Sequence, residues 1–88
     1  MVQRGGDPAQ MRRVAARMED EAAAMEGHLQ RLLEEADAAF WQGADADAFR
    51  ERLNAEHTTA VTRTVESVRT AAREMRRQAA DQERTSAG

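Results

Sequence analysis

The stretch that decides the fold is residues 40–49, Phe-Trp-Gln-Gly-Ala-Asp-Ala-Asp-Ala-Phe, in the middle of an 88-residue chain. It contains the single Trp, Trp41, and the internal Gly43, while the sequence on both sides is dominated by Ala, Arg, Glu, Gln, Met and Leu, all good helix formers. Gly43 can adopt a positive φ that these residues resist, so it can end a helix and reverse the chain. We therefore expect one helix over about residues 8–39 and a second over about residues 46–83.

The first helix has a clear start signal and one apolar stripe. Pro8 is the single Pro and suits the first helical position, while Asp7 can cap the free amides and Gln10 can complete a capping box. The stripe repeats every 3.5 residues on average, which is the coiled-coil period. Its members are Met11, Ala15, Met18, Ala22, Met25, Leu29, Leu32, Ala36 and Ala39, with Val14 and Leu33 on its flanks.

The second helix follows a turn assigned to residues 40–45, and Asp45 and Asp47 suit its positively polarised start. Its stripe is Ala46, Phe49, Leu53, His57, Val61, Val65, Val68, Ala72, Met75 and Ala79. The consecutive four-residue steps between Phe49 and Val65 depart from a heptad, so this helix should unwind or straighten near His57. Residues 84–88 have no apolar partner and are expected to form a flexible tail.

The composition indicates a core that a single hairpin leaves incomplete. Of the 41% hydrophobic residues, 19 residues are Ala, which leaves 17 large apolar side chains. The expected fold class is all-α, a helical hairpin that pairs into a four-helix bundle. The residues expected to pack in that dimer are Met11, Val14, Met18, Met25, Leu29, Leu32, Phe40, Phe49, Leu53, Val61, Val65, Val68 and Met75.

The same composition argues against several functional classes. There is no Cys, so disulfides and thiolate chemistry are excluded, and no motif for catalysis, a cofactor or a metal site is recognised. No apolar run approaches the roughly 18 residues of a membrane span, and residues 1–7 lack the apolar stretch of a signal peptide. The net charge of -3, with no aromatic residues among the Arg cluster, disfavours nucleic-acid binding. We expect neither an enzyme nor a membrane-inserted protein.

The charges are distributed unevenly. Residues 19–47 hold nine acidic residues and one Arg, whereas both ends of the chain are net basic. Folding about the turn should place residues whose numbers add to about 85 side by side, bringing Arg12 and Arg13 next to Arg73, Arg76 and Arg77. Two hairpins packed head to tail would then set acidic regions against basic ones, although simple solvated faces remain the alternative.

The same fold-over rule places His28 opposite His57, near Glu26 and Glu56. Such a group could form a metal site or a layer that senses pH, because His changes charge near neutral pH. His28 flanks the heptad stripe, however, so an ordinary exposed or hydrogen-bonded histidine is the favoured interpretation.

The turn resembles the WXG family, the early-secreted-antigen-like substrates of type VII secretion. The resemblance rests on Trp41-Gln42-Gly43 with Phe40 before it and Phe49 six residues after the glycine, at the centre of a short two-helix chain. It implies a hairpin that pairs with a second hairpin, a different WXG-like protein first and a second copy as the other possibility. It also implies secretion without a cleavable signal peptide, with Trp41 and Gly43 helping the secretion ATPase to recognise the protein.

One family feature is missing. A Tyr-x-x-x-Asp/Glu signal commonly follows the second helix in one member of each pair, and this chain has no Tyr. The resemblance therefore implies that a partner carries the signal. For Trp41 a purely structural role, as a ring that plugs the end of the bundle, also remains open. The alternative function is an intracellular coiled-coil adaptor unrelated to secretion.

Overall fold

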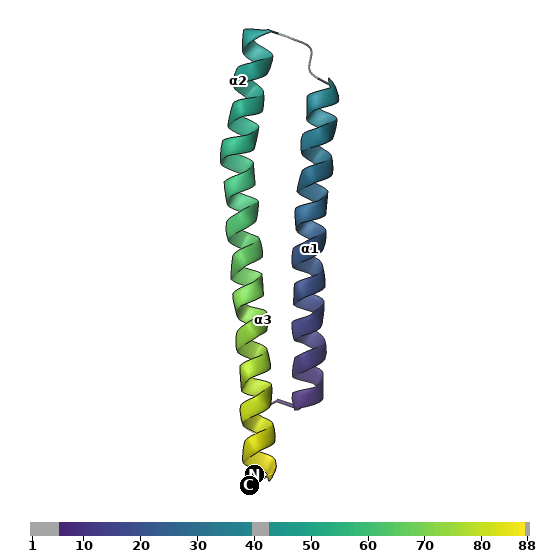
Figure 1. Ribbon diagram of the computed structural model, residues 1–88, viewed down its shortest axis with the longest axis vertical. Coiled ribbons are helices and arrows are strands. Elements are labelled where there is room, and N and C mark those ends of the chain that lie inside the picture. Colours follow the sequence, from purple (N-terminus) through teal and green to yellow (C-terminus); the bar gives the residue numbers. More distant parts are fainter. Residues whose placement is uncertain (1–5, 40–42, 88) are drawn as a thin grey trace.

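The computed structural model describes residues 6–39 and 43–87, which form an elongated helical hairpin of 66 × 19 × 16 Å. The first arm is α1, Pro8–Ala39. The second arm runs without a break through α2, Ala44–Arg52, the π-helical turn η1, Leu53–His57, and α3, Thr58–Ala87. Figure 1 shows the two arms antiparallel and side by side.

The helix starts are stabilised as the sequence predicts. At the start of α1, the carboxylate of Asp7 accepts a hydrogen bond from the amide of Ala9 at 3.0 Å, although Gln10 makes no bond back to Asp7. At the start of α2, Gly43 has φ +151°, a value that L-residues rarely adopt, and Asp45 lies in the first turn. Phe40 and Trp41 lie outside the residues that the structure describes.

The predicted unwinding near His57 is confirmed by η1, whose i→i+5 hydrogen bonds characterise a π-helix. Polar side chains bond to backbone carbonyl oxygens in and next to this turn. The Asn54 side-chain amide donates to the Arg50 carbonyl oxygen at 3.1 Å, and the Thr59 hydroxyl donates to that of Ala55 at 2.6 Å. The π-turn accommodates the four-residue spacing of apolar residues, which an ideal α-helix would carry around to another face.

The buried core within the described residues is small and made almost entirely of alanine. Ala15, Ala22, Val65, Ala72 and Ala79 are each at most 1% exposed. They repeat every seven residues along each arm, as expected for a coiled-coil seam, and small side chains allow the two helices to approach closely. The large side chains nearer the turn are half-buried or exposed, so tight packing is confined to the half of the hairpin farther from the turn.

The two ends of the second arm differ from the prediction. This arm begins at Ala44, two residues before the expected start, and it continues through Ala87. The flexible tail over residues 84–88 was therefore a wrong prediction for residues 84–87. Local bonds explain the extension, because Arg84 forms an ion pair with Asp81 and the Thr85 hydroxyl donates to the Asp81 carbonyl oxygen.

Candidate interaction surface

Three ion pairs close one side of the seam between α1 and α3, and we call this side the charged edge. Its pairs repeat every seven residues along both helices, with nitrogen–oxygen distances of 2.6 to 2.7 Å. They are Arg12 with Glu83, Glu19 with Arg76, and Glu26 with Arg69. Five of the six residues follow an apolar seam position, as Glu19 follows Met18, while Glu83 follows Gln82. The position after the seam is where cross-helix ion pairs form in an antiparallel coiled coil.

Hydrogen bonds along the charged edge shift the protonation equilibria of its members. The hydrogen bond from Arg76 lowers the pKa of Glu19, and that from Arg12 lowers the pKa of Glu83, in each case against partial desolvation. The same bonds raise the pKa of Arg12 and Arg76, and the hydrogen bond to Glu26 raises the pKa of Arg69. Arg12 also lies close enough to oppose the charge of Arg76, but each has its own carboxylate partner. Two of the five Arg residues expected to cluster at the end away from the turn, Arg12 and Arg76, are thus each paired with a carboxylate of the other helix.

The fold-over rule is close to the observed pairing near the turn, but at the end of the hairpin away from the turn it places Arg12 near Arg76 and misses the ion-pair partner of Arg12. Asp37 lies 3.2 Å from Arg50, close to the predicted register. Arg12, however, pairs with Glu83, which lies ten residues beyond Arg73. The second arm starts beyond the end of α1, as Figure 1 shows, and the π-turn adds a residue to it. Helical side chains also lean toward the N-terminus of their own helix, which carries an antiparallel pair farther apart in number.

The opposite side of the seam has apolar residues in place of ion pairs, and we call it the open edge. Its α1 residues include positions that precede the seam, as Val14 precedes Ala15. None of its members is buried, and Val14 and Leu32 are 39% and 54% exposed. The open edge consists of Val14, Met18, Met25, Leu29 and Leu32 from α1 and Val61 and Val68 from α3.

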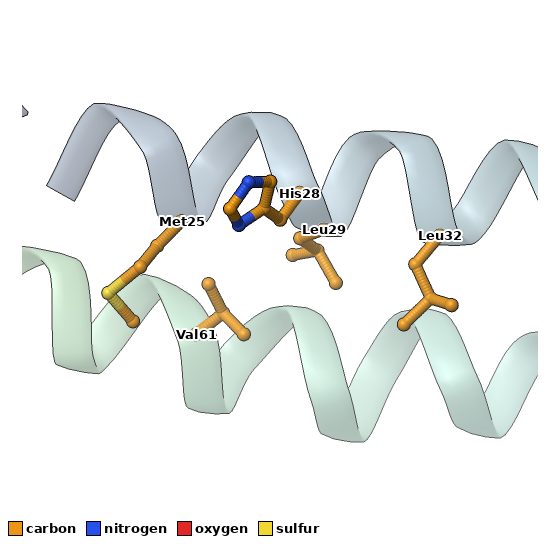
Figure 2. A pocket seen from close by; sticks show the side chains of 5 residues that line it. All are labelled: Met25, His28, Leu29, Leu32 and Val61. Atoms are coloured by element: carbon orange, nitrogen blue, oxygen red, sulfur yellow. The ribbon is translucent and has the colours of Figure 1, made fainter. Parts of the chain in front are cut away.

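Two grooves follow the open edge. Figure 2 shows the first, of about 250 Å³, where Met25, Leu29 and Leu32 extend from α1 toward α3 and Val61 points back at them, with His28 beside α1. The second has about 360 Å³ and is lined by Val14, Arg17, Met18, Glu21 and Val68. In each groove α1 supplies four of the five lining residues and α3 a single Val. Such shallow apolar grooves suit the side chains of a packing helix rather than chemistry on a small substrate.

A third groove, beside the turn, has a different character. It has about 240 Å³ and is lined by Gln30, Leu33, Glu34, Asp37 and Asn54. Polar groups here bond to one another, since Gln30 donates to Glu34 at 3.2 Å and Arg50 lies 2.9 Å from Asp47 as well as near Asp37. The exposed ring of Phe49 has the guanidinium of Arg52 at 6.0 Å from its centroid. This polar groove offers little apolar surface to a partner.

The structure distributes the residues predicted for dimer packing among different environments. Val65 is buried inside the hairpin, whereas Met11, Leu53 and Met75 are half-buried and Phe49 is 39% exposed. The seven residues of the open edge stay accessible. Phe40 and Trp41 lie outside the described residues, so the packing predicted for Phe40 and the role predicted for the ring of Trp41 stay predictions.

The two histidines lie in different surroundings. His28 lines the first groove next to Val61, while His57 is exposed in the π-turn, and no hydrogen bond or ion pair joins them. Within residues 6–39 and 43–87 no group of three His, Cys, Asp or Glu side chains is placed to hold a metal ion. In the same residues no helix is long and apolar enough to cross a membrane.

The charged edge is what sequence reasoning missed. The signal was present, because Arg12, Glu19 and Glu26 are seven residues apart and so are Arg69, Arg76 and Glu83. Summing charge over long segments hid this repeat. Reading the charged residues at intervals of seven along each helix would have revealed it.

Comparison with known proteins gives no relative: no protein-family model, curated protein or solved structure matches this chain. The resemblance to the WXG family therefore rests on the residues around Trp41 and Gly43.

Proposed function

We propose that this protein is a small secreted hairpin of the WXG type, a substrate or co-substrate of type VII secretion that acts by pairing with a second helical hairpin and has no enzymatic activity. The observation that carries the proposal is the open edge. Seven of the larger apolar side chains line one accessible side of the hairpin, and such a chain gains stability when a second hairpin covers that side.

The energetics of the open edge support this pairing. Leu32 and Val14 keep 54% and 39% of their surface exposed, and the valine and methionine neighbours are only half-buried. Burying apolar surface yields roughly 25 cal/mol per Å², so a partner laid along several such side chains gains several kcal/mol before its ordering cost. A four-helix bundle is the arrangement that covers both grooves at once.

The turn supplies the expected contact with the secretion machine. Gly43 adopts its unusual backbone conformation immediately before α2, and in the WXG family the Trp and Gly of this turn help the secretion ATPase to recognise its substrate. Because the chain contains no Tyr, we expect a Tyr-x-x-x-Asp/Glu signal on a partner hairpin when the protein is exported.

Export from the source organism tests the proposal. An epitope-tagged chain should appear in the culture medium when the type VII ATPase is present and remain in the cells when it is deleted. Trp41→Ala should reduce export without weakening pairing, whereas Leu32→Glu should weaken pairing directly. Equal amounts in the medium with and without the ATPase would refute the secretion route.

An intracellular coiled-coil adaptor is the second candidate, and the seven-residue repeat of ion pairs on the charged edge favours it. The two functions give different results in the same experiment. An adaptor stays in the cell pellet with and without the ATPase, and Trp41→Ala does not change its location. A secretion substrate leaves the cell when the ATPase is present, and Trp41→Ala reduces its export.

A further inference from the structure

The part of the second arm next to the turn is packed differently from the rest of the hairpin. We call α2 and η1, residues 44–57, the turn segment, and residues 8–26 with 65–87 the body. All buried side chains of the described residues belong to the body, and so do the three ion pairs of the charged edge. Within the described residues, the turn segment therefore shares neither of the features that hold the two arms together in the body.

The turn segment also approaches α1 at few points. α3 lies along the length of α1, whereas α2 and η1 bring few backbone positions close to it. Figure 1 shows the reason, because α2 starts beyond the end of α1 and overhangs it. The nine residues of α2 and the five of η1 are too few to stay helical in water by themselves. Their helical state therefore depends on limited contact with the rest of the chain.

The π-turn is a weak point at the inner boundary of the turn segment. Its i→i+5 pattern interrupts the α-helical hydrogen bonding between Arg52 and Thr58. The Thr58 hydroxyl oxygen, at the first residue of α3, is buried without a hydrogen-bond partner among the described residues, which costs free energy in the closed hairpin. The second arm should therefore bend or unwind most easily at η1.

A group of three charges ties the turn segment to α1, and we call Asp37, Arg50 and Asp47 the latch. The guanidinium of Arg50 lies 3.2 Å from a carboxylate oxygen of Asp37 on α1 and 2.9 Å from one of Asp47 on α2. The Arg50 side chain is 26% exposed, but those of the two Asp residues are 71% and 64% exposed. Water and salt compete for charges at such exposed positions, so the latch holds the segment only weakly.

We propose that the turn segment opens separately from the body, about η1, when the latch releases. The body keeps its alanine seam and its cross-helix ion pairs, so the two parts open with different free energies. Because Gly43 directly precedes α2, opening changes the direction in which the turn is presented. This lets the secretion ATPase engage the turn while the body stays paired with a partner, and only this consequence rests on the proposed function.

Amide hydrogen exchange of the full chain, followed by mass spectrometry, tests the opening. Amides of residues 46–57 should exchange at least about tenfold faster than those of residues 65–80, with the step in rate at η1. Asp37→Asn removes the charge that ties Arg50 to α1 but keeps the shape of the side chain. It should speed exchange in the turn segment by about threefold and leave the body unchanged. Glu35→Gln removes the same charge from an exposed position of α1 and should change neither part.

Distances between spin labels distinguish movement of the turn segment from local fraying. The chain has no Cys, so label pairs can be placed at exposed positions: Ala38→Cys with Ala48→Cys beside the turn, and Ala23→Cys with Thr70→Cys in the body. Each labelled chain is mixed with excess unlabelled chain, so that distances within one hairpin dominate. We expect a broad distribution that includes long distances for the pair beside the turn and a narrow one for the pair in the body. Asp37→Asn should broaden the first distribution alone.

Three results would each overturn the inference. The pair beside the turn could give a distribution as narrow as the pair in the body, exchange could rise smoothly along the second arm without a step at η1, or Asp37→Asn and Glu35→Gln could act alike. These outcomes are independent of the export experiment. A chain that is exported by the ATPase but has a rigid turn segment keeps the proposed function and loses this inference, and a chain that opens but is not exported does the reverse.

Discussion

The two edges of the seam between α1 and α3 differ in how their side chains are satisfied. On the charged edge, Glu19 and its counterparts bind Arg residues of the other helix at 2.6 to 2.7 Å, so that edge is completed within the chain. On the open edge, Leu32 and Val14 stay 54% and 39% exposed beside two grooves. One edge of the seam is therefore closed by ion pairs within the chain, and the other presents accessible apolar side chains, which is the surface that the proposed pairing would cover.

The difference shows how a small chain can divide the tasks of folding and association. Interhelical ion pairs and small alanines hold the two helices together, while several larger apolar side chains stay accessible, as the proposed pairing requires. The strongest tests therefore disturb the shared seam first, then the turn that sets its register, and then each edge separately.

Widening the seam should have the largest effect. Ala22 is fully buried, so Ala22→Leu forces the helices apart and should lower the free energy of unfolding by about 1–3 kcal/mol. Its neighbour Ala23 is exposed, so Ala23→Leu adds the same atoms where there is room and should have almost no effect. Urea denaturation at one fixed protein concentration measures the free energy of unfolding of both variants. Equal stability of the two variants would show that the seam is loosely packed.

Strain at the turn should come next, because both edges depend on the register that it sets. Gly43 has φ +151°, so Gly43→Ala should lower the free energy of unfolding by about 1–2 kcal/mol. Gly27 lies inside α1, where an added Cβ would meet Arg31 Nη1 at 3.9 Å, an ordinary contact distance. Gly27→Ala is therefore a matched control that should stabilise by about 0.5–1 kcal/mol. Thermal melts should therefore move in opposite directions, and a shared direction would contradict the assigned turn geometry.

A charge on the open edge should weaken pairing without unfolding the hairpin. Leu32 is 54% exposed, so Leu32→Glu fits the single hairpin but cannot be buried against a partner without cost. We expect at least a tenfold loss of affinity, about 1.4 kcal/mol, in sedimentation equilibrium. Ala23→Glu is the control on an exposed position. An unchanged affinity for Leu32→Glu would place the partner elsewhere.

Acid should act on the charged edge and give the smallest effect. The pKa values of Glu19 and Glu83 are lowered in the folded chain, so the unfolded chain binds protons more readily. Stability from these pairs is complete above the ordinary glutamate pKa and is lost as the pH falls through the lowered values. The double variant Glu19→Gln and Glu83→Gln should flatten the loss of stability below pH 4.5, while Glu74→Gln should not. If the double variant and the unmodified chain lose stability equally below pH 4.5, the two ion pairs do not contribute to stability as proposed.

Local patterns predicted the hairpin well because they are fixed by nearby residues. Asp7 and Pro8 mark the start of α1, Gly43 marks the reversal, and the four-residue steps of apolar residues mark the π-turn. The cross-helix partners were harder to predict, because they depend on where the second arm starts and how far each side chain leans. Arg12 is the example: its ion-pair partner is Glu83, whereas the fold-over rule places Arg73 opposite it.

The open edge was only partly predictable for a related reason. The sequence identified Leu32, Val61 and Val65 as one class of packing residue. In the structure, however, Val65 is buried between the two helices of the hairpin, while Leu32 remains accessible. Heptad position decides the difference, and the register of the two arms must be known before it can be assigned. Trp41 lies outside the described residues, and its role remains a prediction.

The most direct test of the central claim is the rate at which peroxide oxidises Met18 and Met25, measured by mass spectrometry in dilute and in concentrated protein with free methionine as the reference. Both methionines are half-exposed in the single hairpin and lie along the open edge. We predict that both become protected at least several-fold as the mass doubles from 9.8 kDa. Unchanged oxidation rates in a chain that has doubled its mass would contradict the claim, because the partner would then cover another surface.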